Sequence, residues 1–350
     1  MTMDKPTQLT TNSPAVKKRR VTVVEVAEAA GVSVSAVSRA FNPEASISRP
    51  LREKVFKAAA ALNYKPNRMA RGIKSRSSLV GILMTDFNNP FYLPILSRFT
   101  SEIQKRDCHS LLINVNSDMD IQEAVELVME YNVDGLIITS ASLPQQLVDA
   151  CRSQNTPVVI FGRDSSDNSV TVVSCDNVLA GRMAADMLLD AGYMRPAFVA
   201  GPIGTSATVD RQRGFISRLM ERGCNQWQVV EGGEFSYDAG YDATLRVFKN
   251  SERPDALFYA DDIMACGGMD ALRYELALKI PQDVGVLGVD DIRLAKSRSY
   301  NLSTIRQPNE EMIQSTMDVL FEHISNPNLP PQSITLPCEP VLRGSTQKHR

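Results

Sequence analysis

The first 76 residues carry the chemistry of a surface that binds a polyanion. They contain 15 Lys and Arg residues but only 5 Asp and Glu residues, a net charge of +10. The other 274 residues contain 23 basic and 35 acidic side chains, so the net charge of −2 for the whole chain conceals an asymmetry. A basic segment on an acidic body predicts that this segment alone meets a nucleic acid. For the run KKRR at 17–20, a solvated tail is the alternative.

The residue types that usually carry catalysis are not arranged for it. The three histidines (His109, His323 and His349) lie far apart and lack metal-ligand spacing. The segment GPIGTSAT at 201–208 is rich in glycine but lacks the Gly-Lys-Ser/Thr of a phosphate-binding loop. The six cysteines are scattered without a C-x-x-C pair, which favours free thiols in a reducing cytoplasm. We therefore expect no enzymatic activity, no metal and no cofactor.

The segment VTVVEVAEAAGVSVSAVSRAFN at 21–42 organises part of the basic region into two helices. Thr22 is a plausible cap for the first helix, and Gly31 suits its end because a left-handed backbone is cheap without a Cβ. Ser33 then caps a second helix after only a few residues. Such a short gap forces a steep crossing, which predicts a helix-turn-helix.

A third helix follows, with Ser48 as its cap and Pro50 in its first turn. Three short helices can bury one small core, which leaves Ser35, Ser38 and Arg39 facing outward on the second helix. A three-helix bundle without a nucleic-acid partner is the alternative. The next segment, NYKPNRMARGIKSR at 63–76, predicts a basic helix at 68–74 that is too short to be stable alone. We expect it to fold only against DNA phosphates, and a linker is the alternative in the DNA-free state.

From Leu79 onward, about nine apolar strand-like runs alternate with amphipathic stretches. This alternation is typical of parallel sheets that are covered on both faces, and the number of runs favours two α/β lobes. Ligands of such sheets bind beyond the carboxyl ends of the strands, which here means the cleft between the lobes. No apolar run is long enough to span a membrane, and we expect no secretion signal at the N-terminus.

Together these patterns resemble the lac repressor/galactose repressor (LacI/GalR) family of bacterial transcription regulators. The resemblance covers residues 21–346, and its most specific parts are VTVVEVAEAAGVSVSAVSRAFN, REKVFKAAAALNYKPNRMAR, DFNNPFY, DRQRGF, DDIMACGGMDAL, IPQDVGVLGVDD and LPCEPVLRGST. It implies an all-α helix-turn-helix DNA-binding head and an α/β bilobal body like a periplasmic binding protein, with two Rossmann-like lobes built on parallel sheets.

The resemblance also implies domain boundaries. A disordered basic tail would occupy 1–20, the helix-turn-helix domain 21–66, the hinge helix and linker 67–78, the effector-binding and dimerisation domain 79–340, and a C-terminal tail 343–350. In this family the chain crosses between the lobes three times. The N-lobe would therefore comprise about 79–175 and 302–325, and the C-lobe about 176–301 and 333–342.

For the head, the resemblance implies which residues contact DNA. Base-reading positions would be Val34, Ser35 and Arg39, with Arg39 pairing to guanine and Val34 touching a thymine methyl. Phosphates would be bound by Thr22, Ser33, Ser38 and Asn42. The hinge would contribute Asn67, Arg68 and Ile73. Ile73 stands where the family usually inserts Leu into the minor groove. Ala36 stands where the family commonly has a Thr that binds a phosphate, so this contact is not expected here.

For the body, the resemblance implies effector contacts in the cleft, namely Asp86, Phe91, Tyr92, Arg163, Arg211, Asp261 and Asp290. The aspartates would bind sugar hydroxyls, the aromatic rings would cover a sugar face, and Arg211 would take a hydroxyl or an anion. The family often has Asp-Arg after the fourth strand, but here Gly162 precedes Arg163, which favours an acidic or phosphorylated ligand. For Asp261, Asp262, Asp290 and Asp291, loop capping is the alternative.

The resemblance implies a sequence-specific repressor of sugar-utilisation genes. It would bind a palindromic operator as a homodimer, because one helix-turn-helix reads too few base pairs. A sugar or sugar phosphate would control it, and it would act in the bacterial cytoplasm at the nucleoid, without a membrane partner. We expect no tetramerising tail after residue 346. A periplasmic-type sugar-binding protein and a sugar-modifying enzyme are the alternatives. The basic head disfavours the first, and the lack of a catalytic constellation disfavours the second.

Overall fold

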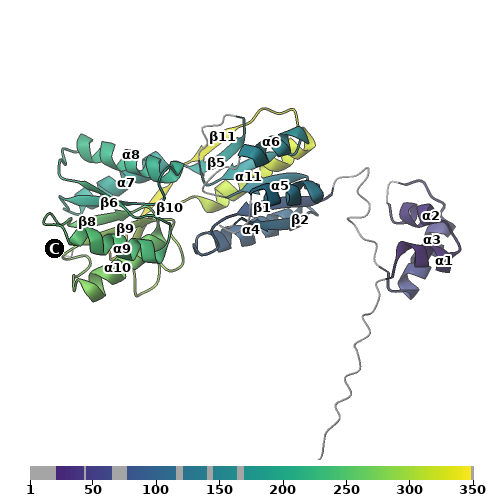
Figure 1. Cartoon of the computed structure of the whole chain (residues 1–350), viewed down its shortest axis with the longest axis horizontal. Helices are drawn as coiled ribbons and strands as arrows, with labels where there is room; N and C mark the ends of the chain where they lie inside the picture. Colours follow the sequence, from purple (N-terminus) through teal and green to yellow (C-terminus); the bar gives the residue numbers. More distant parts are fainter. Residues whose placement is uncertain are drawn as a thin grey trace, which may run out of the picture. The chain divides into compact units, whose positions relative to one another are not determined.

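The computed structural model describes residues 21–42, 45–64, 77–115, 121–139, 145–163 and 169–347. They belong to two compact units that divide between Ser75 and Arg76, and we call these units the head and the body (Figure 1). The expected hinge residues Asn67, Arg68 and Ile73 lie outside the described residues, as does the KKRR run.

The head consists of three helices, α1 Val23–Ala30, α2 Val34–Ala40 and α3 Arg49–Ala61. One fully buried valine from each helix, Val26, Val37 and Val55, forms the centre of its core. The turn between α1 and α2 depends on Gly31, whose φ of 57° lies in the left-handed region. The predicted helix-turn-helix is therefore present, and its core is small because the helices are short.

The body contains two six-stranded sheets, each covered by helices. The first sheet and the helices on it form the N-lobe, and its strand order is β11-β5-β4-β3-β1-β2, parallel throughout. Its strands are β1 Leu79–Met84, β2 His109–Asn114, β3 Gly135–Ile138, β4 Val158–Phe161, β5 Thr171–Cys175 and β11 Ser333–Leu336. Its helices are α4 Tyr92–Lys105, α5 Ile121–Glu130, α6 Gln145–Ser153 and α11 Asn309–Ser325.

The second sheet and its helices form the C-lobe, with the order β12-β10-β9-β8-β6-β7 and only β12 antiparallel. Its strands are β6 Pro196–Ala200, β7 Gln228–Glu231, β8 Ala256–Tyr259, β9 Gly285–Val289, β10 Ser303–Arg306 and β12 Glu339–Val341. Its helices are α7 Asn177–Asp190, α8 Ser206–Glu221, α9 Tyr237–Phe248 and α10 Asp262–Asp270, which continues as a π-helical turn, η2 Ala271–Glu275.

The expected lobe boundaries are wrong at two short strands. β10 was expected in the N-lobe but pairs with β9 of the C-lobe, with Ser303 opposite Leu287. β11 was expected in the C-lobe but pairs with β5 of the N-lobe, with Ser333 opposite Val172. Each of these strands has only four residues, and polar and apolar side chains are mixed in both. The sequence of such a strand therefore does not indicate which of the two sheets it joins. The chain therefore crosses between lobes near Asp176, at 307–308 and at 337–338, one strand later than expected at the second and third crossings.

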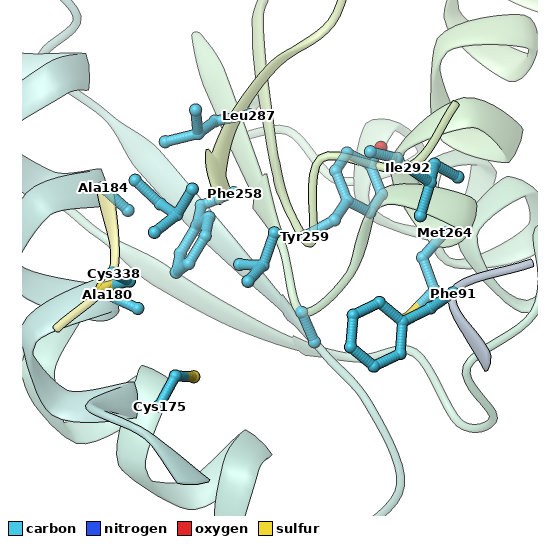
Figure 2. Close-up of a cluster of buried hydrophobic side chains, with 14 of the residues drawn as sticks. Phe91, Cys175, Ala180, Ala184, Phe258, Tyr259, Met264, Leu287, Ile292 and Cys338 are labelled. Atoms are coloured by element: carbon cyan, nitrogen blue, oxygen red, sulfur yellow. The ribbon is translucent and has the colours of Figure 1, made fainter. Parts of the chain in front are cut away.

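The two lobes share one hydrophobic cluster. Phe91, which follows β1 in the N-lobe, belongs to the same cluster as Met264 of α10 in the C-lobe, and Figure 2 shows both side chains. Within the C-lobe, α7 and α8 approach closely because Gly181 and Gly214 lie between them. A Cβ on Gly214 would lie 2.0 Å from the carbonyl oxygen of Val178. Among the described helices, none is both long and apolar enough to cross a membrane.

Candidate functional site

The head presents α2 as its exposed polar surface. Val37 and Ala40 of α2 are buried against α1 and α3, while the three residues expected to read bases, Val34, Ser35 and Arg39, are exposed. Ser38, expected at a phosphate, is also exposed. One helix face thus carries hydroxyls, a guanidinium group and a small apolar side chain, which are the groups that read base edges in the major groove. Ala36 is buried, so it offers no contact in place of the family's usual Thr.

The other expected phosphate contacts lie at the ends of the helices. Thr22 caps α1 in a capping box, because its hydroxyl accepts from the backbone N–H of Glu25 and its own N–H donates to the Glu25 carboxylate at 2.6 Å. Ser33 caps α2, accepting from the Ala36 N–H at 3.2 Å. Arg52 of α3 donates to the carbonyl oxygen of Asn42 at 3.1 Å and so holds the chain that leaves α2. These exposed side chains combine a structural role with a position suited to a phosphate.

In the body, a pocket lies where strands of both sheets end. It contains about 360 Å³ of space not filled by atoms, and it is lined by Asn89, Phe91, Tyr92, Gly162, Arg163, Ala207, Arg211, Phe235, Asp261, Asp290 and Gln307. We call it the interlobe pocket. Six of the seven expected effector residues line it, and Asp86 is the exception.

Arg163 occupies the N-lobe side of the interlobe pocket. Its guanidinium group lies 5.7 Å from the centroid of the Phe235 ring in the C-lobe, and it donates to the Tyr92 hydroxyl at a long 3.4 Å. Its Nη1 is buried and has no hydrogen-bond partner among the described residues. Because a buried unpaired donor costs roughly 1–3 kcal/mol, this atom fits an acceptor supplied by a ligand.

Arg211 is positioned by the close packing of α7 and α8. Its Nε donates to the Asn177 side chain at 2.9 Å, and its Nη1 donates to the carbonyl oxygen of Ala260. A Cβ on Gly181 would lie 2.1 Å from the Arg211 carbonyl oxygen, so this glycine allows the backbone of α8 to reach its place. Arg211 therefore has a structural role in addition to the expected ligand contact.

Two buried carboxyl groups face these cations. Asp261 accepts from the Asn89 side-chain amide at 2.9 Å, a bond between the two lobes. Asp290 accepts from the Gln307 side-chain amide at 2.6 Å. Burial raises the pKa of Asp261 to about 8, with the neighbouring Asp290 adding to the shift, and burial raises the pKa of Asp290 to about 6 although Arg211 opposes it. The side-chain amide oxygen of Gln307, Oε1, is buried without a partner among the described residues, so it fits a ligand donor.

The remaining aspartates have structural partners. Asp86 accepts from the Asn89 backbone N–H at 3.0 Å and lies outside the pocket lining, and burial raises its pKa. Asp262 accepts from the Thr304 hydroxyl at 2.6 Å, which ties α10 to β10. Asp291 forms an ion pair with Arg343 at 2.5 Å. Asp262 and Asp291 therefore stabilise the fold, which agrees with the alternative that these aspartates hold loops in place rather than bind the effector.

Five of the lining residues were not among the expected effector contacts: Asn89, Gly162, Ala207, Phe235 and Gln307. Asn89 lies within the motif DFNNPFY and could have been found there. Gln307 was missed because the second lobe crossing was expected before it rather than at it. Ala207 lies at the start of α8, and Phe235 lies in the loop between β7 and α9. Neither segment has a sequence motif that indicates a ligand. No group of His, Cys, Asp and Glu with the arrangement of a metal site occurs among the described residues.

Two family models match the chain. Residues 22–67 match the model for bacterial regulatory proteins of the lacI family, and residues 185–346 match a periplasmic binding protein-like domain. Among curated relatives, the ribose operon repressor of Escherichia coli (strain K12) is 31% identical over 331 residues, which cover 93% of this chain and 99% of the relative.

Solved structures give the same result. A lac repressor dimer bound to operator and the anti-inducer ONPF is similar with a TM-score of 0.81 and 26% identity, covering 94% of this chain and all of that chain. A LacI family regulator from Enterococcus faecium with bound ribose is similar with a TM-score of 0.70 and 25% identity, covering 78% of this chain and all of that one. The predicted fold, a helix-turn-helix head with a bilobal α/β body, is confirmed.

Proposed function

Since this chain belongs to the lacI family of bacterial regulatory proteins, we propose that it is a repressor that binds a palindromic operator as a homodimer under the control of a sugar. Membership of the family makes the chain an effector-controlled, DNA-binding transcriptional repressor. The family consists of regulators rather than enzymes, so the prediction that the chain has no enzymatic activity is confirmed. To reach its operator, the protein acts in the cytoplasm at the nucleoid.

The interlobe pocket is the observation that supports a sugar as the effector. Asp261 and Asp290 offer carboxylates to hydroxyl donors, and the rings of Phe91, Tyr92 and Phe235 offer apolar faces to a sugar ring. The Arg163 Nη1 and the Gln307 side-chain oxygen Oε1, both unpaired among the described residues, supply one donor and one acceptor for the same ligand. The names of the relatives agree with this class, because one represses a ribose operon and one structure holds ribose.

A sugar phosphate is the second ligand class within this proposal. Two guanidinium groups, those of Arg163 and Arg211, line the interlobe pocket together with the two carboxyl groups. Arginine suits the planar, bidentate recognition of phosphate. A neutral pentose or hexose, however, leaves the two carboxylates without an added anionic neighbour, and we favour it for that reason.

For DNA, the proposal assigns base reading to Val34, Ser35 and Arg39. Phosphate contacts fall to Thr22, Ser33, Ser38 and Asn42, and to Asn67 and Arg68 of the hinge. The homodimer doubles these contacts across a two-fold axis, which is how helix-turn-helix proteins gain specificity. Ile73 of each subunit would enter the minor groove at the centre of the operator.

A thermal-shift screen with the full chain tests the effector. Ribose, other pentoses, hexoses and their phosphates are compared at equal concentration, and a ligand present at 100 times its Kd stabilises the folded protein by about 2.7 kcal/mol. We expect at least one neutral sugar to raise the melting temperature of the body and to change retention of a selected palindromic DNA fragment. If only sugar phosphates stabilise the protein, the effector is an anionic sugar derivative and not a neutral sugar. No stabilisation by any member of either class would contradict the proposed ligand.

A further inference from the structure

Asn177 is a buried polar residue at the point where the chain first passes from the N-lobe to the C-lobe. It is the first residue of α7, follows the N-cap Asp176, and is only 4% exposed. It is not among the residues that line the interlobe pocket, whereas Arg211 of α8 is. Any effect of Asn177 on a ligand in that pocket must therefore act through a neighbour.

Two donors converge on the side-chain oxygen of Asn177. The Nε of Arg211 donates to Oδ1 at 2.9 Å, and the Cys175 thiol donates to the same atom at 3.4 Å. Burial raises the pKa of Cys175 to about 11, so its thiol keeps the hydrogen that it donates at neutral pH. If the amide were turned by 180°, its own N–H groups would face the Arg211 donor, and arginine has no acceptor. These neighbours therefore determine which way the Asn177 amide points.

The backbones that carry Asn177 and Arg211 are held at a fixed spacing by the packing of α7 on α8. A Cβ on Gly181 would lie 2.1 Å from the carbonyl oxygen of Arg211, and a Cβ on Gly214 would lie 2.0 Å from that of Val178. Because the two helices already touch at these glycines, the bond between Oδ1 and Nε sets the direction of the guanidinium group rather than the position of the helix.

Both acceptors that hold Arg211 are uncharged. One is the Asn177 amide oxygen, and the other is the carbonyl oxygen of Ala260, which accepts from Nη1. Neither bond pairs the guanidinium charge with a carboxylate, so this charge acts on the pocket. Burial raises the pKa of Asp290, which lines the pocket, to about 6, and the charge of Arg211 limits this rise.

An acidic side chain at position 177 would change this balance. Asp has nearly the same shape as Asn and also offers an oxygen to Nε, but its carboxylate would form an ion pair with the guanidinium group. The charge of Arg211 would then be neutralised by a residue that does not line the pocket. Less of this charge would act on Asp290 and on a bound ligand, so the shape and the charge of residue 177 have separable effects.

We propose that Asn177 is a positioning residue of the interlobe pocket. Its uncharged side-chain oxygen directs the Arg211 guanidinium group and leaves the charge of that group to Asp290 and the effector. This role rests on the proposed function, because it serves ligand binding in that pocket. Tight binding of an effector then requires an acceptor at position 177 that carries no charge.

NMR of the arginine Nε–Hε groups tests the positioning in the full chain without sugar or DNA. Arg211→Lys identifies the Arg211 signal, and the exposed Arg253 serves as the reference for free exchange with water. We expect the Arg211 hydrogen to exchange far more slowly than that of Arg253, and Asn177→Ala to speed its exchange at least about tenfold by removing the acceptor. Asn177→Ser replaces Asn177→Ala if the latter does not fold. Asn177→Asp should keep the slow exchange, because it keeps an acceptor.

A pH titration of the Asp290 carboxyl group tests the need for an uncharged acceptor, again without ligand. Carboxyl ¹³C NMR follows the titration, and Asp290→Asn identifies the signal. Asn177→Asp should raise the midpoint by at least about half a pH unit, because the added negative charge opposes Arg211. Asn250→Asp, the same change at an exposed position of the C-lobe, is the matched control and should leave the midpoint unchanged.

Calorimetric titration with D-ribose and with ribose 5-phosphate then measures the effect on binding. Asn177→Ala and Asn177→Asp should each bind the probe that the parent binds at least about tenfold more weakly, whereas Asn250→Asp should match the parent. The inference is overturned if Asn177→Ala keeps the slow exchange, if Asn177→Asp leaves the Asp290 titration unchanged, or if either variant binds the probe as tightly as the parent. If the parent binds neither probe, the proposed effector is wrong, and the two measurements without ligand still decide the role of Asn177.

Discussion

Under the proposed function, the ionisation of two buried carboxyl groups would control how tightly the interlobe pocket binds a sugar. Asp261 and Asp290 are both nearly inaccessible to solvent, and each has a polar partner from a different segment, Asn89 and Gln307. A carboxylate accepts hydrogen bonds from sugar hydroxyls, whereas a protonated carboxyl must donate one hydrogen of its own. Because burial raises both pKa values, the empty pocket retains protons that a bound sugar must displace.

This coupling predicts that effector affinity rises with pH. The pKa values of about 8 for Asp261 and about 6 for Asp290 lie above the ordinary value for Asp, so both groups release protons when a sugar bonds the ionised forms. Affinity should increase as the pH rises through the range from about 6 to about 8, by up to about tenfold per proton per pH unit. Calorimetry at several pH values, in two buffers with different ionisation enthalpies, measures both the affinity and the protons released.

In the protein without effector, the same two carboxyl groups make the folded state less stable as the pH rises, whereas they make effector binding tighter. Their folded pKa values exceed the unfolded value of about 3.9, so the folded state holds more protons between that value and about 8. Their contribution to the free energy of unfolding therefore decreases as the pH rises through this window. An effector affinity that is independent of pH, or that falls as the pH rises, would contradict the assigned role of these carboxylates.

Asp290→Asn should remove one charged hydroxyl acceptor from the interlobe pocket without creating a cavity. We expect effector affinity to fall about 10- to 100-fold, because a hydrogen bond to a charged group contributes roughly 1.5–3 kcal/mol. Operator affinity without effector should be unchanged, because Asp290 lies in the body. Asp242→Asn, at an exposed position of α9, is the control and should behave like the parent protein. If both variants respond to the same effector concentration as the parent, the ligand lies elsewhere.

Among helices and strands, the turn between α1 and α2 depends on the backbone conformation of a single residue, Gly31. Gly31→Ala adds a Cβ that would meet only the Lys54 ammonium nitrogen at 3.6 Å, an ordinary contact. Its cost is therefore conformational, since φ is 57° and a left-handed backbone costs an L residue about 1 kcal/mol. Hydrogen exchange of the α1 and α2 amides should show faster opening, with weaker operator binding at raised temperature.

Gly31→Asn serves as the matched control for this prediction. Asn tolerates the left-handed region better than Ala does, so Gly31→Asn should be less damaging although its side chain is larger. Equal effects of the two substitutions would mean that side-chain size, and not backbone conformation, limits this turn.

The same turn shows how far the sequence determines structure. Thr22, Gly31 and Ser33 predicted the ends of α1 and α2 because capping depends on neighbouring residues alone. The strands β10 and β11, by contrast, were assigned to the wrong lobes, because four-residue strands gain their partners from distant segments. The effector residues were implied by the family resemblance, and most of them lie in segments that follow parallel strands, which brings those segments together. Phe235 was missed because it lies in the loop 232–236 between β7 and α9, which carries no motif that the resemblance assigned to the effector.

Across the whole molecule, the three crossings between the lobes connect the ligand to the rest of the chain. Gln307 lies on the second crossing and lines the interlobe pocket, and its buried side-chain oxygen Oε1 has no hydrogen-bond partner among the described residues. Asn177, beside the first crossing, accepts from Arg211, which lines the same pocket. A ligand that bonds Gln307 and Arg211 therefore acts near two of the three crossings. Any rotation of the lobes that it stabilises would change the spacing of the two N-lobes in a dimer and bias folding of the hinge helices.

Ile73→Gly tests this coupling at the hinge. The substitution removes the expected minor-groove wedge and lowers helix propensity by about 1 kcal/mol. We expect loss of most operator specificity and most effector response, while the effector still stabilises the body in a thermal-shift measurement. Ile73→Leu, which restores the family's usual residue, should retain both properties. If Ile73→Gly keeps the parent's specificity ratio and response, the hinge is a passive linker.

The equilibrium affinity of the full chain for a palindrome selected from random DNA tests the central claim most directly. It is measured with and without the effector over a range of salt concentrations, against a scrambled sequence of equal length. Each neutralised phosphate contributes about −0.9 to the slope of log K against log salt, so six or more contacts predict a slope of about −5 or steeper. The account predicts this steep slope, a preference of at least about 10³ for the palindrome, and a shift with effector. A shallow slope, equal binding of the scrambled DNA, or an affinity that no effector changes would contradict it.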